Sequence, residues 1–204
     1  MKRVAIIGAG GHAKVVISTL RAAGFQVTLV VDDDPAKHGA ALLGIPVIGP
    51  TSALAQGDFD GCVIAVGQNR TRRSIASKLR ESWITAIHPE AIIDDSVTVA
   101  VGTVIFAGAV IQPDTVVGEH AIVNTGATID HDCVIGDFAH IAPGVQLAGD
   151  VQVGAGTLLG IGTVAIPGIR IGKDATVGAG SVLVRDVPDG AIVYGNPGKS
   201  RRST

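Results

Sequence analysis

The second half of the chain repeats a hydrophobic residue every six positions. From Ala91 to Asp186 the sequence divides into 16 hexads without an insertion, and the third residue is Ile, Val or Leu in 15 of them. Chance does not hold such a register over this length. Glycine and polar residues gather in the latter half of each hexad, where tight turns favour them. The pattern predicts a parallel β-solenoid in which each hexad is a short strand plus a turn, with its third residue facing inward.

Three hexads per coil would make a triangular prism in which residues 18 positions apart are stacked. At the usual strand spacing of about 4.8 Å, the predicted five or so coils would rise about 25 Å. The period itself does not determine the handedness of the solenoid.

The first half lacks this period and alternates between strand and helix patterns. Strands are predicted over 3–8, 26–35 and 61–69, and helices over 13–24 and 70–82, with a short strand in 83–91 leading into the hexads. This order is typical of a small parallel α/β unit. We therefore predict a Rossmann-like α/β half-domain over residues 1–88, followed by a β-helix domain with a C-terminal tail over residues 89–204.

Composition and charge exclude several partners. The formal net charge is −2, so the charge balance gives no indication of a nucleic-acid partner. No segment approaches the roughly 20 apolar residues of a membrane helix, and the apolar run near the N-terminus is too short for a signal-peptide core. We expect a cytoplasmic protein without membrane insertion.

Cys62 and Cys133 show no metal-binding spacing and are expected to be reduced, buried thiols.

A glycine-rich loop lies between the first predicted strand and the first predicted helix. The stretch from Gly8 to Ala13 contains Gly10, Gly11 and His12, and fits a fingerprint in which backbone N–H groups approach a phosphate. Asp32 and Asp33 stand at the end of the second strand, where an acid can bind a ribose hydroxyl. A half-sheet of this size favours a mononucleotide or nucleotide-sugar over NAD, although a strand–helix turn that binds nothing remains an alternative.

Two further candidate residues lie at the end of the third predicted strand. Gly67 and Asn69 stand in "VGQN", and the carboxyl ends of parallel strands are where ligands bind in such sheets. They are secondary candidates for the same pocket.

Ionisable residues interrupt the apolar hexads at "ATIDHDCVIG". Asp130, His131 and Asp132 fall on a predicted turn, so the repeat passes through them while Ile129 and Ile135 keep the inward positions. A histidine next to a carboxylate is suited to general-base chemistry, because its pKa lies near working pH and the acid can orient the ring. A solvated turn pair is the alternative.

Three stretches together resemble one family. They are "IIGAGGHAKVV" near the N-terminus, the hexads that contain "HD", and "YGNPGK" near the C-terminus. The combination resembles the bacterial sugar acetyltransferases of the NeuD/PglD type over nearly the whole chain. The resemblance implies a left-handed β-helix, a homotrimer, and acetyl-CoA as co-substrate in the groove between neighbouring β-helices, without a metal.

The resemblance also implies an activity. We expect N-acetylation of the 4-amino group of a nucleotide-linked 4-amino-4,6-dideoxy sugar for glycan assembly, with UDP favoured and GDP or dTDP left open. O-acetylation of sialic acid or of another sugar hydroxyl is the runner-up.

Site residues follow from the matching motifs. His131 matches the catalytic base and Asp132 the acid that orients it, although relatives often carry Glu there. The other matches are Gly10, Gly11, His12, Asp32, Asp33, Gly67 and Asn69 for the nucleotide-sugar pocket, Asn124 near the sugar, His140 and Gly149 flanking the thioester, and Ile161 and Ala179 along the pantetheine arm.

Several of these residues also have simpler interpretations. Asp130 is expected to be an ordinary turn acid and Cys133 a packing residue, while His140 can simply face solvent or a neighbouring subunit. Arg201, Arg202 and Lys199 can meet the 3′-phosphate of CoA, but a solvated tail is favoured.

Two other function classes make different demands on the sequence. A zinc carbonic anhydrase of the hexapeptide type needs a histidine pair five residues apart, which the chain lacks. A non-catalytic nucleotide-sugar scaffold predicts that replacing His131 changes nothing.

Overall fold

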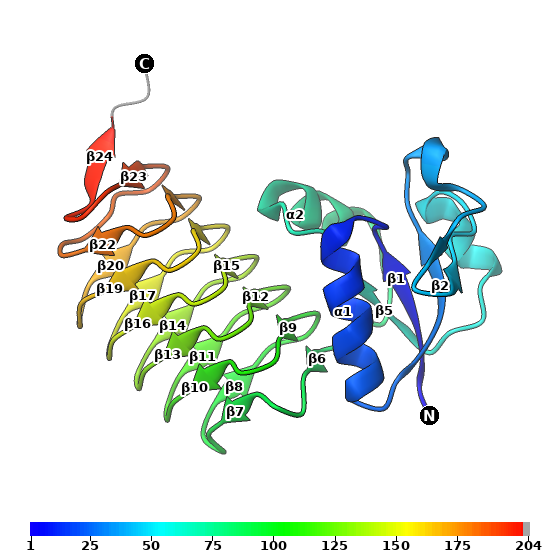
Figure 1. Cartoon of the computed structure of the whole chain (residues 1–204), viewed down its shortest axis with the longest axis horizontal. Coiled ribbons are helices and arrows are strands. Elements are labelled where there is room, and N and C mark those ends of the chain that lie inside the picture. The colour runs from blue at the N-terminus through cyan, green and yellow to red at the C-terminus, as the bar shows by residue number, and fades with distance from the viewer. Residues whose placement is uncertain (202–204) are drawn as a thin grey trace.

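The computed structural model describes residues 1–201, and an α/β unit in it precedes a long parallel β-solenoid (Figure 1). The predicted fold class is confirmed, and the solenoid is consistent with the left-handed β-helix that the family resemblance implies. Arg202 and the two residues after it, which end the predicted tail, lie outside the described residues. None of the helices in the described part is both long and apolar enough to span a bilayer.

The α/β unit is built on a three-stranded parallel sheet. Its order is β2-β1-β5. The helix α1 begins at Gly11, two residues before the prediction, because Gly10 serves as its N-cap. The helix α2 ends at Lys78, before the predicted end, because the chain turns so that Trp83 bridges Cys62 of β5. The elements are β1 Arg3–Ile7, α1 Gly11–Ala22, β2 Gln26–Val31, η1 Pro35–Lys37, β3 Ala41–Leu42, β4 Ile45–Pro46, η2 Thr51–Gln56, β5 Gly61–Ile64 and α2 Asn69–Lys78.

The solenoid places one two-residue strand at the second and third positions of every hexad, as predicted. Its strands are β6 Ala86–Ile87, β7 Ile92–Ile93, β8 Thr98–Val99, β9 Val104–Ile105, β10 Val110–Ile111, β11 Val116–Val117, β12 Ile122–Val123, β13 Thr128–Ile129, β14 Val134–Ile135, β15 His140–Ile141, β16 Gln146–Leu147, β17 Gln152–Val153, β18 Leu158–Leu159, β19 Val164–Ala165, β20 Arg170–Ile171, β21 Thr176–Val177, β22 Val182–Leu183, β23 Ile192–Tyr194 and β24 Lys199–Arg201.

Three sheets form the faces of the prism, and we call them S1, S2 and S3. S1 has the order β24-β23-β21-β18-β15-β12-β9-β6, S2 the order β22-β19-β16-β13-β10-β7, and S3 the order β20-β17-β14-β11-β8. Paired residues differ by 18 positions, as Val110 and Thr128 do, which confirms three hexads per coil. The chain passes from S1 to S2 to S3 and back, so three edges separate the faces: S1–S2, S2–S3 and S3–S1.

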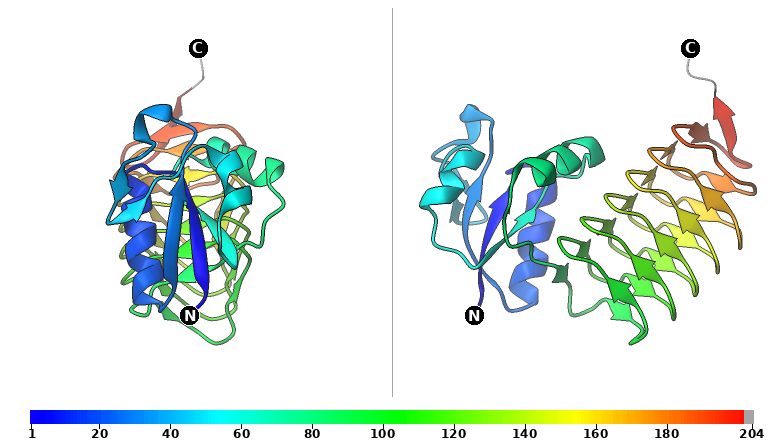
Figure 2. Two further views of the ribbon diagram at one scale, coloured as in Figure 1. Left: turned by 90° about the vertical axis from the view of Figure 1, so that its right-hand side faces the viewer. Right: turned by 180° about the vertical axis from the view of Figure 1, so that it is seen from behind.

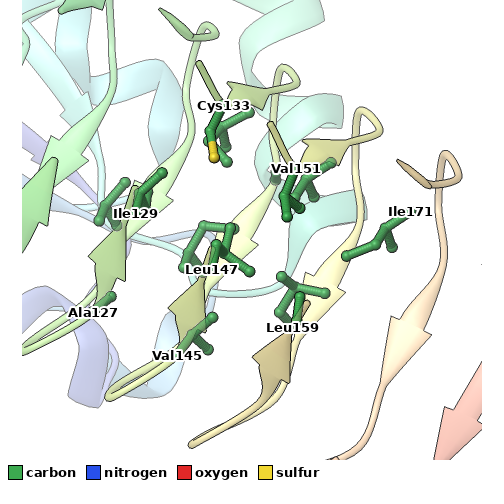
Figure 3. Packing of buried hydrophobic residues seen from close by; sticks show 14 of the residues in the cluster. Ala127, Ile129, Cys133, Val145, Leu147, Val151, Leu159 and Ile171 are labelled. Carbon is green, nitrogen blue, oxygen red and sulfur yellow. The ribbon is translucent and has the colours of Figure 1, made fainter. Parts of the chain in front are cut away.

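The third residue of each hexad points into the prism. Ile105, Ile129 and Leu159 are fully or almost fully buried, and successive coils stack these aliphatic side chains (Figure 3). Ile93 and Val99 are only partly buried because they belong to the first coil, which has no coil before it. Cys133 is a free, buried thiol among them, as is Cys62 in the α/β unit. The expectation of reduced packing cysteines is therefore confirmed.

The α/β unit docks on S1. In Figures 1 and 2, α1 lies between the small sheet and the solenoid. Val104, Phe106 and Ile122 of the solenoid join the core of α1 and the small sheet, and all three are buried. The strand β6 pairs with β9, so S1 starts just before the proposed domain boundary at residue 88. This contact fixes which side of the solenoid the N-terminal loop faces.

Candidate functional site

A cavity of about 350 Å³ opens at the carboxyl ends of β1 and β5. The structure brings six of the predicted pocket residues together in its wall, and beside them lie Lys37, Thr51 and Thr71, which no motif in the sequence had indicated. Gly8 makes the loop possible, because its φ is +107° and a Cβ there would lie 2.8 Å from Val66 Cγ2. The predicted residues are Gly10, Gly11, His12, Asp32, Asp33 and Gly67.

Asp32 holds the glycine loop in place. Its Oδ2 accepts bonds from Ala9 N (2.7 Å) and Lys37 Nζ (2.9 Å), and its Oδ1 accepts one from Asp34 N (2.9 Å). Burial acts to raise the pKa of this carboxyl, but the bonds from Lys37 and Ala9 outweigh it and lower the pKa. Asp32 is therefore an ionised structural anchor that brings the Lys37 ammonium to the pocket.

Asp33 is freer to meet a ligand. Its Oδ1 accepts bonds from the backbone N–H and the hydroxyl of Thr51, which lower the pKa of the carboxyl. Its Oδ2 accepts no bond from residues 1–201. A charged carboxylate oxygen at the pocket wall is suited to a ribose hydroxyl or another donor of the ligand.

A second group lies where the pocket meets the solenoid. His140, on β15, has Nδ1 3.3 Å from Gly67 O and Nε2 3.1 Å from Asn124 Nδ2. His12 lies against it, with ring centroids 6.1 Å apart, and against Phe106 at 5.5 Å. Burial, and then the charge of Arg72, lower the pKa values of His12 and His140 to about 4. Both rings are neutral at physiological pH.

The hydrogen bonds of His140 fix its tautomer. Asn124 Oδ1 accepts from Thr125 N, so Asn124 Nδ2 is a donor and His140 Nε2 must accept. The proton is then on Nδ1, where it is donated to Gly67 O. The backbone N–H of His140 donates to Thr157 O in the solenoid ladder. His140 therefore offers a thioester no free backbone donor.

Asn69 lies outside the wall of the cavity. Its Nδ2 donates to Gly156 O (2.8 Å) and Thr157 O (3.1 Å), and its Oδ1 accepts from Arg72 Nη2 (3.0 Å). The structure thus places this predicted pocket residue in the contact between the two domains.

His131 and Asp132 lie on the S2–S3 edge, after β13. His131 Nδ1 is 2.7 Å from Asp132 Oδ2, and both side chains are more than half exposed. The bond to Asp132, and then the charge of Asp130, raise the pKa of the imidazole. Nδ1 is held by the carboxylate, and Nε2 has no hydrogen-bond partner among residues 1–201.

Gly149 lies one coil further along, directly against the His131 ring. A Cβ on Gly149 would lie 2.5 Å from His131 Cε1 and 2.6 Å from Nε2, so only glycine leaves room for the imidazole. The Gly149 N–H donates to no group in residues 1–201. Asp130 and His131 share a surface cavity of about 370 Å³ with Gly149 and Gly168. An imidazole with a free ring nitrogen and a free backbone donor therefore border the same cavity.

The predicted acetyl-CoA residues divide between two edges. Ile161 and Ala179 follow β18 and β21 on the S1–S2 edge, the edge that also carries Asn124, and Ile161 is 61% exposed. His131 and Gly149 lie on the S2–S3 edge. Within one chain the pocket and the base thus belong to opposite sides of S2. Among the described residues, no three His, Cys, Asp or Glu side chains gather in a way that could hold a metal ion.

Comparison with known proteins gives the same division of the chain. Residues 3–79 match the PglD N-terminal domain, and residues 114–149 match the bacterial transferase hexapeptide repeat. Perosamine N-acetyltransferase from Caulobacter crescentus, solved as a histidine-to-asparagine variant with CoA and GDP-perosamine, is 42% identical. The match covers 100% of this chain and 98% of that one, with a TM-score of 0.94.

The chain belongs to the sugar acetyltransferases of the NeuD/PglD type. Another solved member, the acetyltransferase domain of PglB from Neisseria gonorrhoeae in complex with acetyl coenzyme A, is 40% identical over 98% of this chain and 99% of that one, with a TM-score of 0.90. UDP-N-acetylbacillosamine N-acetyltransferase from Bacillus subtilis is 39% identical over 113 residues. That alignment spans 52% of each protein, so the chain matches about half the length of this curated relative.

Proposed function

We propose that the protein is an acetyl-CoA-dependent N-acetyltransferase that acts on the 4-amino group of a nucleotide-linked 4-amino-4,6-dideoxy sugar, with His131 as the general base. It would serve glycan assembly in the cytoplasm. One observation carries the chemistry: the outward Nε2 of His131 lies beside the free backbone N–H of Gly149. The relatives that bind GDP-perosamine or act on a bacillosamine nucleotide support the substrate class.

The two half-sites require a second copy of the chain. The pocket with His12, His140 and Asn124 lies toward the S1–S2 edge, whereas His131 lies on the S2–S3 edge. A threefold axis facing S2 would bring the S1–S2 edge of one copy against the S2–S3 edge of the next. The outward side chains of S2 include Ile92, which is 67% exposed, and the half-buried Val110, Val164 and Val182. We therefore propose a homotrimer with three shared sites.

The acceptor half-site binds the nucleotide-sugar. The N–H groups at the start of α1 and the Lys37 ammonium would attract the diphosphate, and Asp33 would accept from the nucleoside. The sugar would then extend past His140 and Asn124 toward the S1–S2 edge. UDP is the favoured nucleotide, and GDP or dTDP fits the same arrangement.

The donor half-site carries out the transfer. The thioester carbonyl oxygen would accept from Gly149 N–H, which stabilises the charge that develops there by about 3 kcal/mol. The acceptor nitrogen attacks the carbonyl carbon, and His131 Nε2 takes the proton that this nitrogen loses. The same proton then goes to the departing thiolate of CoA, so the products are the N-acetyl sugar and the free thiol. Asp132 stabilises the imidazolium between these two steps.

A substrate panel tests the activity. UDP-, GDP- and dTDP-linked 4-amino sugars are each incubated with acetyl-CoA, and free thiol is measured. At least one should release thiol in step with acetylated product, and the UDP sugar is expected to be the best. If none reacts while a free sialic acid does, the protein is an O-acetyltransferase and the proposal is wrong.

A further inference from the structure

The side chain of Arg72 is buried between the two domains without a carboxylate partner. The residue is 1% exposed. An arginine has five N–H donors in a fixed plane, and here all five donate to an oxygen within 3.1 Å. Nε donates to His120 O (2.7 Å), and Nη1 donates to Val66 O (3.0 Å) and Gly67 O (3.1 Å). Nη2 donates to Phe138 O (2.7 Å) and Asn69 Oδ1 (3.0 Å). A buried cation is normally costly, and carbonyl dipoles alone compensate this one.

The five acceptors come from both domains. Val66 and Gly67 follow β5 at the floor of the nucleotide-sugar pocket, and Asn69 begins α2. His120 and Phe138 lie on two successive coils of the S3–S1 edge. A single planar group therefore sets the distance between the pocket and the solenoid.

One of these acceptors also connects Arg72 to the acceptor site. Gly67 O receives a bond from Arg72 Nη1 and a second from His140 Nδ1. Gly67 O and the Asn124 amide together hold the proton of His140 on Nδ1, so the position of this carbonyl fixes one of the two bonds that orient the ring. A carbonyl that moved away would free the imidazole to rotate or change tautomer.

We propose that Arg72 is a positioning residue for the acceptor site: by clamping Gly67 O between the two domains, it holds His140 in its Nδ1–H tautomer and fixes the pocket relative to the S1–S2 edge. This role rests on the proposed function for its kinetic consequence, but its structural consequence at His140 is independent of any substrate. Arg72 does not touch the reacting atoms and acts through Gly67 and His140.

The charge of Arg72 adds a second effect. The titratable and charged groups that face the guanidinium are His12 of α1, His140 of β15, His120 of the S3–S1 edge, and Arg73 of its own helix. After burial, Arg72 is a cause of the lowered pKa in each of the three histidines. Burial lowers the pKa of Arg72 itself to about 10, which still leaves it charged at neutral pH. Burial and this cation together keep the neighbouring rings neutral.

The matched variants are Arg72→Lys, Arg72→Met and Arg73→Lys. Lysine keeps the charge at position 72 but has three donors on a compact ammonium and cannot reach both domains in one plane. Methionine removes charge and donors together. Arg73 is the control, because it lies on the same helix but is partly exposed and pairs with Asp174 at 3.0 Å.

The first readout needs no substrate. In protein labelled with ¹⁵N-histidine, the ring signals of His140, assigned with His140→Gln, should show the Nδ1–H tautomer and no titration between pH 8 and pH 5.5. Arg72→Lys should lose the single tautomer. Arg72→Met should lose it too and raise the pKa of His140 toward its ordinary 6.5, because the cation is, after burial, a cause of the lowered pKa. Arg73→Lys should match wild type.

The second readout is kinetic. Arg72→Lys should raise KM for the nucleotide sugar about tenfold, as expected for the loss of a charged hydrogen-bond network, with KM for acetyl-CoA unchanged.

Unchanged His140 spectra in both folded Arg72 variants would overturn the proposal. A changed spectrum without any acetyltransfer in wild type would instead contradict the proposed function and leave the positioning role standing. Equal rises in both KM values would indicate a merely structural role and also overturn it.

Discussion

Histidines occupy two opposite environments in this protein. His131 stands on an exposed edge of the solenoid next to Asp132 and Asp130, and its pKa is raised. His12, His120 and His140 lie where the domains meet, close to the buried Arg72, and their pKa values are lowered to about 4. The charged form of the same side chain is thus favoured on one edge and disfavoured where the domains meet.

This contrast separates chemistry from binding. Carboxylates around His131 favour the charged form that a general base passes through. Burial, and then the charge of Arg72, disfavour that form at His140 and His12, so these rings offer fixed donors, acceptors and shape. The difference is made by the surroundings of the rings, Asp132 and Asp130 in one case and burial beside Arg72 in the other, not by the histidines themselves.

Removing the base has the largest expected effect. His131→Ala should lower kcat by about 10³-fold, within the range of general-base catalysis, while KM for the nucleotide sugar stays close to wild type. Steady-state kinetics measure both, and circular dichroism checks the fold. Retention of more than half the wild-type kcat would exclude His131 as the base.

Crowding the base has the next largest effect. Gly149→Ala places a methyl group 2.5 Å from His131 Cε1, and displacement of the ring by about 1 Å should cost about 10²-fold in kcat. The control is the same substitution in the His131→Ala background, where no ring remains to displace and the further loss should vanish. Equal losses in both backgrounds would mean that Gly149 acts through its N–H or backbone alone.

Replacing the orienting acid should change the pH profile more than the rate. Asn at position 132 can still accept from His131 Nδ1, so we expect kcat at pH 8.5 to fall only about tenfold. The carboxylate raises the pKa of His131, and activity needs the neutral ring, so the acidic limb of kcat/KM should move to lower pH in Asp132→Asn. A limb that stays in place would show that another group sets it.

The smallest effect is on stability at the domain contact. His120 stacks on Phe138, 5.2 Å between centroids, and its buried Nδ1 has no partner among the described residues. Because the folded pKa is about 4 and the unfolded value about 6.5, its contribution is complete above pH 6.5 and is lost progressively toward pH 4. Phenylalanine does not titrate. The difference in unfolding free energy between His120→Phe and wild type should therefore favour the variant by about 1 kcal/mol more at pH 5.5 than at pH 8.

Denaturant unfolding at the two pH values measures this difference. Phenylalanine is tolerated at the positive φ of this corner, since Phe138 has φ +58° at the equivalent position of the next coil and His120 has +51°. A stability difference independent of pH would show that His120 does not titrate on unfolding as described.

The sequence predicted the solenoid almost residue by residue. Each hexad is a local unit whose inward position is fixed by its own turn, so Ile129 and Leu147 could be placed without knowing the rest of the fold. The stacking of Gly149 under His131 also follows from their separation of 18 positions, the period of one coil.

The domain contact could not be predicted in the same way. Arg72 is one of three arginines in "RTRR", and nothing in the local pattern distinguishes the buried one from its partly exposed neighbour Arg73. Its role depends on how the α/β unit docks on S1, which is a long-range packing problem. For the same reason Asn69, predicted to line the pocket, lies in the contact between the domains.

The most direct test of the split site is complementation between two inactive variants. Gly10→Glu keeps the fold, because a Cβ at Gly10 meets no atom within 4 Å, but it fills the pocket with a negative charge. His131→Ala removes the base. Each homotrimer should be inactive. Trimers refolded from an equal mixture should recover about one quarter of the wild-type rate, since each shared site draws one half from each of two chains. No recovery above the two separate variants would place the whole site within one chain and contradict the account.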